Sequence, residues 1–386
     1  MTTQTKTKPA RLLSLDILRG ITIAGMILVN NPGSWGKIYA PLRHAEWHGL
    51  TPTDLVFPFF MFIMGVSTYM SLRRYNFRLS AESLWKVVRR TVVIFFIGIF
   101  IAWFGLTMRR ISSGRGVIEA MVNFDSIRML GVMPRLALCY GVGSLLALCF
   151  TRKVLVWIVG VGLAAYAAVL LLCNGLVFSA DNIIAVIDRA VLGEAHMYSD
   201  TIDGITLKFD PEGLLSTIPS ICHMLIGYLC GSMIMSLQDN RERVLRLFIV
   251  GACLTFAGLL LNYGCPINKK IWSPTFVLTT CGLASTLLAL LMWVIDILGH
   301  KRWCRFFESF GVNPLFMYCL GAVLSILFGY IRVGDASLHS WLYNDIWTPL
   351  AGGDAVLGSL FYALAFVGLN WCVGYILYKK KIYIKI

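Results

Sequence analysis

The stretch HAEWHGLTPTDLVFPFFMFIMG, from His44 to Gly65, joins a polar loop to an apolar run. Thr51 can cap a helix here, Pro52 suits its first turn, and Asp54 occupies the position of a capping-box acid. The run that follows, residues 55–65, is almost wholly apolar and predicts a membrane span. Titratable and aromatic side chains are thereby held at a membrane surface: His44, Glu46, Trp47, His48 and Asp54. A histidine there can take up and release protons near neutral pH.

The composition is typical of a membrane protein. Of the 386 residues, 58% are hydrophobic and 14% are charged, whereas soluble proteins carry about 25% charge. The mean hydropathy is +0.73. The formal net charge of +14 is carried largely by Lys and Arg that flank apolar runs, so it indicates membrane topology and not nucleic-acid binding. The eleven cysteines form no CxxC pair and are interpreted as small apolar residues.

Repeated apolar runs of about 20 residues, the length that crosses a hydrocarbon core of ~30 Å, predict an all-α polytopic fold with about ten transmembrane helices. The expected spans are roughly 13–31, 54–72, 87–106, 132–151, 154–173, 215–237, 246–263, 275–298, 311–331 and 356–378. No internal repeat or linker divides the chain. We therefore expect a single transmembrane domain over residues 1–386, with larger outer loops at 174–214 and 332–355.

The placement of Lys and Arg predicts that both termini are cytoplasmic. Lys6, Lys8 and Arg11 precede the first apolar run, as in a signal peptide, but Asp16 and Arg19 interrupt that run. We therefore expect an uncleaved first span. The loop at 174–214 is acidic, which suits the outside. One outer loop is an exception, because residues 107–131 carry four arginines: Arg109, Arg110, Arg115 and Arg128.

Five motifs in order along the chain resemble the heparan-α-glucosaminide N-acetyltransferase family and its bacterial NagX-like (DUF5009) relatives, which are polytopic membrane acetyltransferases. The motifs are HAEWHGLTPTDLVFPFFMFIMG at 44–65, LDILRGITIAGMILVNN at 15–31, GVMPRLALCYG at 131–141, INKKIWSPTFVLTTCG at 267–282 and FGVNPLFMYCLG at 310–321. The resemblance implies acetyl transfer from acetyl-CoA to the amine of a glucosamine-type sugar on the outer side. Two alternatives stay open: an amino-sugar permease, and a transmembrane O-acetyltransferase of a surface polysaccharide.

The resemblance places the catalytic histidine of the family at His44, as a general base or as a nucleophile that carries the acetyl group. By residue type alone, a histidine that hydrogen-bonds a loop carbonyl would be favoured. His48 ranks second. The functional asparagine of the family matches Asn30, with Asn31 as second choice and as a candidate contact to the cofactor. Their amides would hold an oxyanion, or would simply satisfy carbonyls at the helix end.

Four charged residues are open to two interpretations. Asp54 either caps a helix or orients His44. Asp16 and Arg19 are three residues apart and can form an ion pair in a helix, and a purely structural role for this pair is slightly favoured. The alternative is that Arg19 binds a phosphate of CoA. Arg135 keeps the arginine of a family Leu-Gln-Arg pattern, although Pro134 replaces the glutamine. It would anchor at the interface or bind an anionic group of the cofactor.

A polar turn at 268–272 precedes the eighth expected span. Asn268 and Lys269, together with Trp47, are candidates for contacts with the sugar, against the alternative of a solvated loop. Trp272 is expected at the membrane interface. Asn313 and Pro314 open the ninth span and are interpreted as packing residues.

The sequence also supports predictions about metals, partners and cellular location. The six histidines show no paired ligand spacing, so no metal is expected. The expected partners are acetyl-CoA, an amino-sugar or glycan acceptor, the lipid bilayer and a second copy of the chain, without nucleic acid. The lack of an extension before the first span favours a bacterial cytoplasmic (inner) membrane, by analogy.

Overall fold

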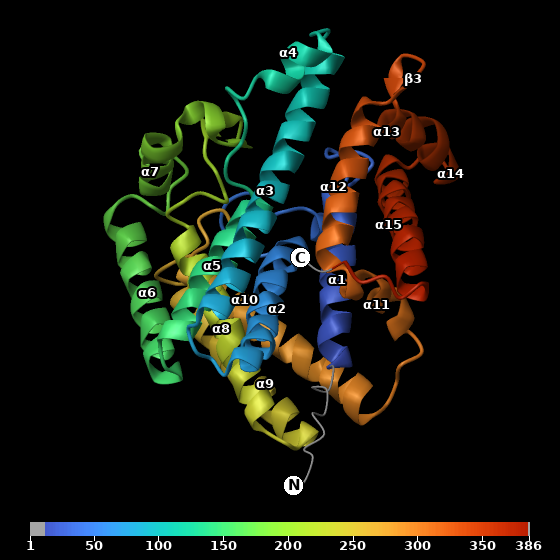
Figure 1. Ribbon diagram of the computed structural model, residues 1–386. Coiled ribbons are helices and arrows are strands. Elements are labelled where there is room, and N and C mark those ends of the chain that lie inside the picture. Colours follow the sequence, from blue (N-terminus) through green and yellow to red (C-terminus); the bar gives the residue numbers. More distant parts are fainter. Residues whose placement is uncertain (1–11, 385–386) are drawn as a thin grey trace.

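The computed structural model describes residues 12–384, which are mainly helical with almost no sheet (Figure 1). The long helices are α1 (Leu13–Asn30), α2 (Val56–Leu72), α3 (Ala81–Ser112), α5 (Val132–Cys149), α6 (Arg152–Leu172), α8 (Thr217–Ser236), α9 (Asn240–Leu261), α10 (Pro274–Leu291), α12 (Pro314–Tyr330) and α15 (Ala355–Lys379). The shorter helices are α4 (Val117–Val122), α7 (Ile183–Leu192), α11 (Cys304–Val312), α13 (Leu338–Trp341) and α14 (Thr348–Leu350). Two small antiparallel hairpins pair β1 (Ser199–Ile202) with β2 (Ile205–Lys208), and β3 (Arg332–Val333) with β4 (Ala336–Ser337).

Within the described residues, nine helices are long and apolar enough to cross a membrane, or ten if α11 and α12 together form one bent span. This confirms the predicted all-α polytopic fold, and the chain is an integral membrane protein. The ninth expected span coincides with α12, but the sequence did not predict that α11 meets it at 87°. Pro314 starts α12 and has no N–H to continue the helical hydrogen bonds of α11. The Asn313 side chain instead bonds to the backbone of Ile382 and Ile384.

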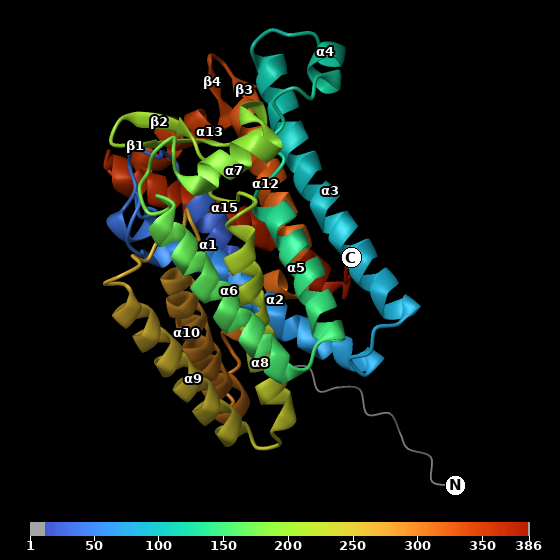
Figure 2. The ribbon, with the colours of Figure 1, turned by 90° about the vertical axis from the view of Figure 1, so that its left-hand side faces the viewer.

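The connections predicted as outer gather at one end of the helix bundle (Figure 2). They are the segments after α1, α3, α6, α9 and α12, and we refer to this as the His44 end. The chain enters α1 at the opposite end (Figure 1). The membrane face that each end meets stays a prediction. Four of the basic residues that support the predicted orientation, Lys6, Lys8, Arg11 and Lys385, lie outside the described residues.

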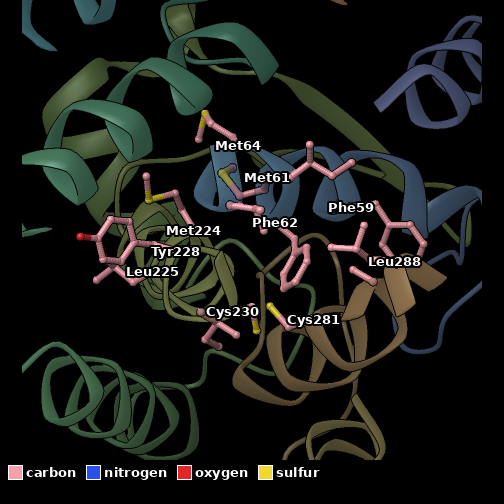
Figure 3. Close-up of a cluster of buried hydrophobic side chains, with 14 of the residues drawn as sticks. Phe59, Met61, Phe62, Met64, Met224, Leu225, Tyr228, Cys230, Cys281 and Leu288 are labelled. Carbon is pink, nitrogen blue, oxygen red and sulfur yellow. The ribbon is translucent and has the colours of Figure 1, made fainter. Parts of the chain in front are cut away.

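The largest core cluster joins α2, α8 and α10 (Figure 3). Phe62 and Met61 of α2 face Met224 and Leu225 of α8 in this cluster. The two backbones come very close, because a Cβ added at Gly65 would overlap the carbonyl oxygen of Met224. Small residues permit this kind of contact between membrane helices. The contact fixes α2, and with it the loop that carries His44.

We expect Gly65→Ala to lower the free energy of unfolding by about 1–3 kcal/mol, because the new methyl group must displace backbone atoms of α8. Thermal unfolding in detergent measures the effect. Gly160→Ala on α6 is the matched control, since a Cβ at Gly160 meets nothing within 4 Å. Equal losses in both variants would contradict the explanation.

Candidate active site

His44 and Asp54 form a close pair on the loop that leads into α2. Nδ1 of His44 lies 2.6 Å from Oδ1 of Asp54. Two acceptors would not approach so closely, so Nδ1 carries the proton and donates to the carboxylate. The His44 side chain is 38% exposed, whereas the Asp54 side chain is 1% exposed. A buried carboxylate therefore orients a partly exposed imidazole, whose other nitrogen, Nε2, is left for a substrate.

The carboxylate of Asp54 is itself held by hydrogen bonds at its second oxygen. Oδ2 accepts from the backbone N–H of Ala45 at 3.0 Å and of Thr51 at 3.1 Å. It also accepts from the Thr51 hydroxyl at 2.9 Å. The predicted capping box is present at the short 3₁₀ helix Pro52–Leu55. The same side chain thus serves both as the cap and as the partner of His44, and its donors favour the ionised form.

Lys269 comes from the turn before α10 to the same place. Its Nζ lies 3.0 Å from Nδ1 of His44 and 3.3 Å from Oδ1 of Asp54. Because Nδ1 already carries a proton for Asp54, the ammonium finds its acceptor in the carboxylate. Burial lowers the pKa of Lys269, although the carboxylates of Asp54 and Glu212 act in the opposite direction. The structure therefore places this candidate sugar contact beside the histidine.

Trp47 joins the His44 loop to the segment between α6 and α8. Its Nε1 donates to the carbonyl of Leu176 at 2.8 Å. Its ring packs on Phe178 and Phe209, with centroid distances of 5.2 and 5.3 Å. Trp47 is thus engaged in packing, and its role in sugar binding stays a prediction. Nearby, Lys270 of the turn before α10 pairs with Asp200 of β1 at 2.6 Å, so that turn is also joined by charge to the segment between α6 and α8.

Asn268 and Trp272 both lie in the interior. Oδ1 of Asn268 accepts from the N–H of Ile271 at 3.2 Å, and Nδ2 lies 3.5 Å from Nδ1 of His48. The expectation that Trp272 lies at the membrane interface is wrong, because its side chain is only 1% exposed. The guanidinium of Arg135 covers its ring at 5.2 Å. A positive φ of 50° at Trp272 turns the chain so that the indole points inward.

Arg135 and the two asparagines have no hydrogen bond to His44 or Asp54 among residues 12–384. Arg135 is fully buried and donates to the carbonyl of Gly213 at 2.9 Å and to the hydroxyl of Ser216. The Asn31 amide donates to the carbonyl of Ile27 at 2.7 Å. Asn31 thus satisfies a carbonyl at the end of α1, which was one of its two predicted roles. Asn30 is exposed. Among residues 12–384, no hydrogen bond joins either asparagine to His44, so their catalytic and binding roles stay predictions.

The predicted ion pair in α1 is confirmed, since Arg19 lies 3.0 Å from Asp16. The guanidinium also donates to the hydroxyl of Ser67 at 2.8 Å and to the carbonyl of Gly311 at 3.3 Å. Arg19 and Ser67 line two cavities, of about 330 and 300 Å³. The first also contains Arg73 and Arg74, near the end opposite His44, and the second extends to Leu136 and Pro314.

Arg128 and Glu212 were not singled out as site residues from the sequence. Arg128 bonds to Asp210, with its Nε at 3.0 Å, and to Glu212. Burial alone would lower the pKa of Arg128, but these two carboxylates raise it. Glu212 also interacts electrostatically with Lys269, so it lies close to the His44 group. The sequence did show an arginine-bearing loop at 107–131 and an acidic loop at 174–214, both predicted on the outer side of the membrane. It did not show which arginine pairs with which carboxylate.

Asp188 of α7 is a buried carboxyl group that should make the stability of the protein depend on pH. Its Oδ1 accepts from the N–H of Leu214 at 2.7 Å, while Oδ2 is buried without a partner. Burial raises its pKa from 3.8 to about 6. The folded state then holds a proton that the unfolded state has lost, so stability should fall as pH rises from about 4 to about 6. We expect Tm to decrease over this range, and Asp188→Asn to remove most of that decrease. An unchanged pH slope in the variant would contradict this assignment.

Two curated proteins are similar to the chain over nearly its whole length. The chain is 27% identical over 436 residues to heparan-alpha-glucosaminide N-acetyltransferase of Homo sapiens, which covers 98% of the chain and 60% of that relative. It is 26% identical over 438 residues to the Mus musculus protein of that name, which covers 97% of the chain and 60% of that relative. The chain is therefore similar over nearly its whole length to two proteins named heparan-alpha-glucosaminide N-acetyltransferase. It spans about 60% of the length of these curated relatives. No protein-family model matches it.

The described residues contain no group of three or more His, Cys, Asp or Glu side chains that could hold a metal ion. The titratable groups around His44 are instead paired with one another. The arrangement is suited to proton transfer at Nε2 of His44, with Asp54 to stabilise the imidazolium.

Proposed function

We propose that the chain transfers the acetyl group of acetyl-CoA to the amine of a glucosamine-type sugar at its His44 end. One observation carries the proposal. Nδ1 of His44 is bonded to a buried carboxylate at 2.6 Å, in a chain whose curated relatives are named for N-acetyl transfer. An imidazole held in this way has a defined tautomer and a free, partly exposed nitrogen.

In the direct route, the sugar amine attacks the thioester carbonyl and gives its proton to Nε2 of His44. The tetrahedral intermediate then collapses, the C–S bond breaks, and the departing thiolate takes the proton from Nε2. Asp54 stabilises the imidazolium between these two steps. Asn30, at the end of α1, is our proposed donor to the oxyanion.

A two-step route uses the same nitrogen. Nε2 attacks the thioester itself and the C–S bond breaks, so that CoA leaves as a thiolate. The sugar amine then attacks the acetyl-imidazole, the bond from Nε2 to the acetyl carbon breaks, and the proton of the amine passes through the freed Nε2 to the thiolate or to water. The pair of His44 and Asp54 serves both routes, since each needs an imidazole with Nδ1–H directed at the carboxylate. Acetyl-labelled protein after incubation with acetyl-CoA alone would separate the second route from the first.

The two cavities at Arg19 support entry of acetyl-CoA from the end opposite His44. Arg73, Arg74 and Arg19 are basic groups that suit the phosphates of CoA. The second cavity contains Arg90 and then apolar residues, including Leu136 and Pro314, which suits an acyl-bearing arm that extends between helices. Arg19 is already paired with Asp16. We therefore propose that Arg19 positions acetyl-CoA together with the exposed Arg73 and Arg74, and not alone.

We expect the double variant Arg73→Ala with Arg74→Ala to raise KM for acetyl-CoA by about tenfold, the loss of one charge-assisted hydrogen bond, while kcat changes little. Initial rates at varied acetyl-CoA and saturating glucosamine measure this. Arg78→Ala is the matched control, because Arg78 is exposed nearby and lines neither of the two cavities. A KM that rises equally in the control would contradict a specific donor path.

Proteoliposomes provide the test of the function. Wild-type protein is given labelled acetyl-CoA and either glucosamine or a sugar that offers only hydroxyl groups, and N-acetylated product is measured. Transfer to the amine alone supports the proposal. Transfer to hydroxyl groups would favour the O-acetyltransferase, and glucosamine uptake without transfer would favour the permease.

The setting of the enzyme is part of the proposal. We infer a bacterial cytoplasmic membrane with the His44 end outward, which labelling of an introduced cysteine in intact cells would test. We also infer a homodimer. A monomer by mass photometry in both detergent and nanodiscs would contradict it.

A further inference from the structure

The largest described cavity, about 670 Å³, lies at the His44 end between α3, α5 and α12. In Figure 2, α3 slants along the outside of the bundle. Three basic residues line the cavity, Arg109, Arg128 and Lys208, and no acidic residue does. Three tyrosines also line it: Tyr198, Tyr318 and Tyr330. We refer to this cavity as the basic groove.

The basic groove is about as deep as one leaflet of a bilayer. Gly98 and Arg109, both on α3, line it. At about 1.5 Å per residue these positions are roughly 16 Å apart along the helix, which is about half of a ~30 Å hydrocarbon core. The α3 residues that line the groove between them are apolar: Ile101, Ala102, Gly105 and Leu106. Across from Gly105 lies Ile326 of α12, 3.5 Å from where a Cβ would be.

The charges are at the aqueous end of this apolar trough. Arg128 is already bonded to Asp210 and Glu212. Arg109 at the end of α3 and Lys208 of β2 have no ion pair among the described residues. Their charge is therefore available to an external anion. The loop at 107–131 is the predicted outer loop that is unexpectedly rich in arginine. Two of its arginines, Arg109 and Arg128, line the basic groove, which carries more positive than negative charge.

We propose that the basic groove binds an anionic lipid of the leaflet at the His44 end. Its phosphate meets Arg109 and Lys208, and one acyl chain lies along α3 between Gly98 and Gly105. Tyr198 and Tyr330 suit the headgroup level, where tyrosine is common in membrane proteins. A small soluble anion would use only the charged end and would leave the apolar trough empty, which is why we favour a lipid. The proposal does not depend on acetyl transfer.

The test uses the full-length protein in nanodiscs of zwitterionic lipid, with fluorescent phosphatidylglycerol as the probe. Each of the two basic groups should contribute about fivefold to affinity, so the double variant Arg109→Gln with Lys208→Gln should bind the probe about 25-fold more weakly. Arg115→Gln is its control, because that exposed arginine pairs with Glu119 and does not line the groove. Gly105→Leu fills the trough and should also weaken binding, whereas Gly160→Leu on the open face of α6 should not.

Three results would overturn the proposal. The first is unchanged affinity in the double variant. The second is equal binding of a zwitterionic probe by the wild type. The third is full displacement of the probe by glycerol phosphate with no effect of Gly105→Leu, which would indicate a site for a soluble anion. Elution volume and Tm of each variant, compared with wild type, exclude misfolding as the cause of a loss.

Discussion

His44→Ala is expected to lower the rate of acetyl transfer by roughly 10²–10⁴-fold, the usual contribution of a general acid–base group. The substitution removes Nε2, which takes the proton in the direct route and carries the acetyl group in the two-step route. It also leaves Asp54 with Lys269 as its remaining charged partner, 3.3 Å away. The measurement is the initial rate of N-acetylglucosamine formation in proteoliposomes, with protein folding checked by Tm.

His48→Ala is the matched control for His44. Both histidines are exposed on the same loop, but Nδ1 of His48 lies near the Asn268 amide and not near the Asp54 carboxylate. Burial lowers the pKa of His48 below the ordinary value of a histidine. We expect its loss to change the rate by less than about threefold. A large loss in His48→Ala with near-normal activity in His44→Ala would reverse the assignment.

Asp54→Asn is expected to reduce the rate by a similar factor, roughly 10²–10⁴-fold. The amide is nearly the same size, but it carries no charge to stabilise the imidazolium. If its NH₂ group faces His44, it also forces Nδ1 to accept a hydrogen bond, and the proton moves to Nε2. Nε2 is then no longer a base. The readout is kcat, with acetyl-CoA and glucosamine both saturating.

Thr51→Val separates this role of Asp54 from its role as a helix cap. The variant removes a hydroxyl whose single proton can reach either the Asp54 carboxylate or the carbonyl oxygen of Arg43, yet it keeps the carboxylate beside His44. Loss of a cap costs about 1 kcal/mol of stability, so we expect a lower Tm and a nearly normal rate. If Thr51→Val lost as much activity as Asp54→Asn, the carboxylate would act through loop structure and not through His44.

The sequence alone determined the features that depend on residues close together in the chain. The membrane spans follow from apolar runs of sufficient length, because each helix satisfies its own backbone hydrogen bonds in lipid. The capping box at Thr51 and Asp54, and the pair of Asp16 and Arg19, each lie within one helical turn. The resemblance to the family was recognisable because five short motifs keep their order.

Only the tertiary structure decided which of the candidates meet. His44 and Asp54 are 10 residues apart and touch because the loop folds back, and Lys269 joins them from 225 residues beyond His44. The burial of Trp272 and the ion pair of Arg128 with Glu212 are equally invisible in sequence. These contacts depend on how close-packed helices such as α2 and α8 place the ends of distant loops. Local periodicity determines each helix, but the packing between helices determines the site.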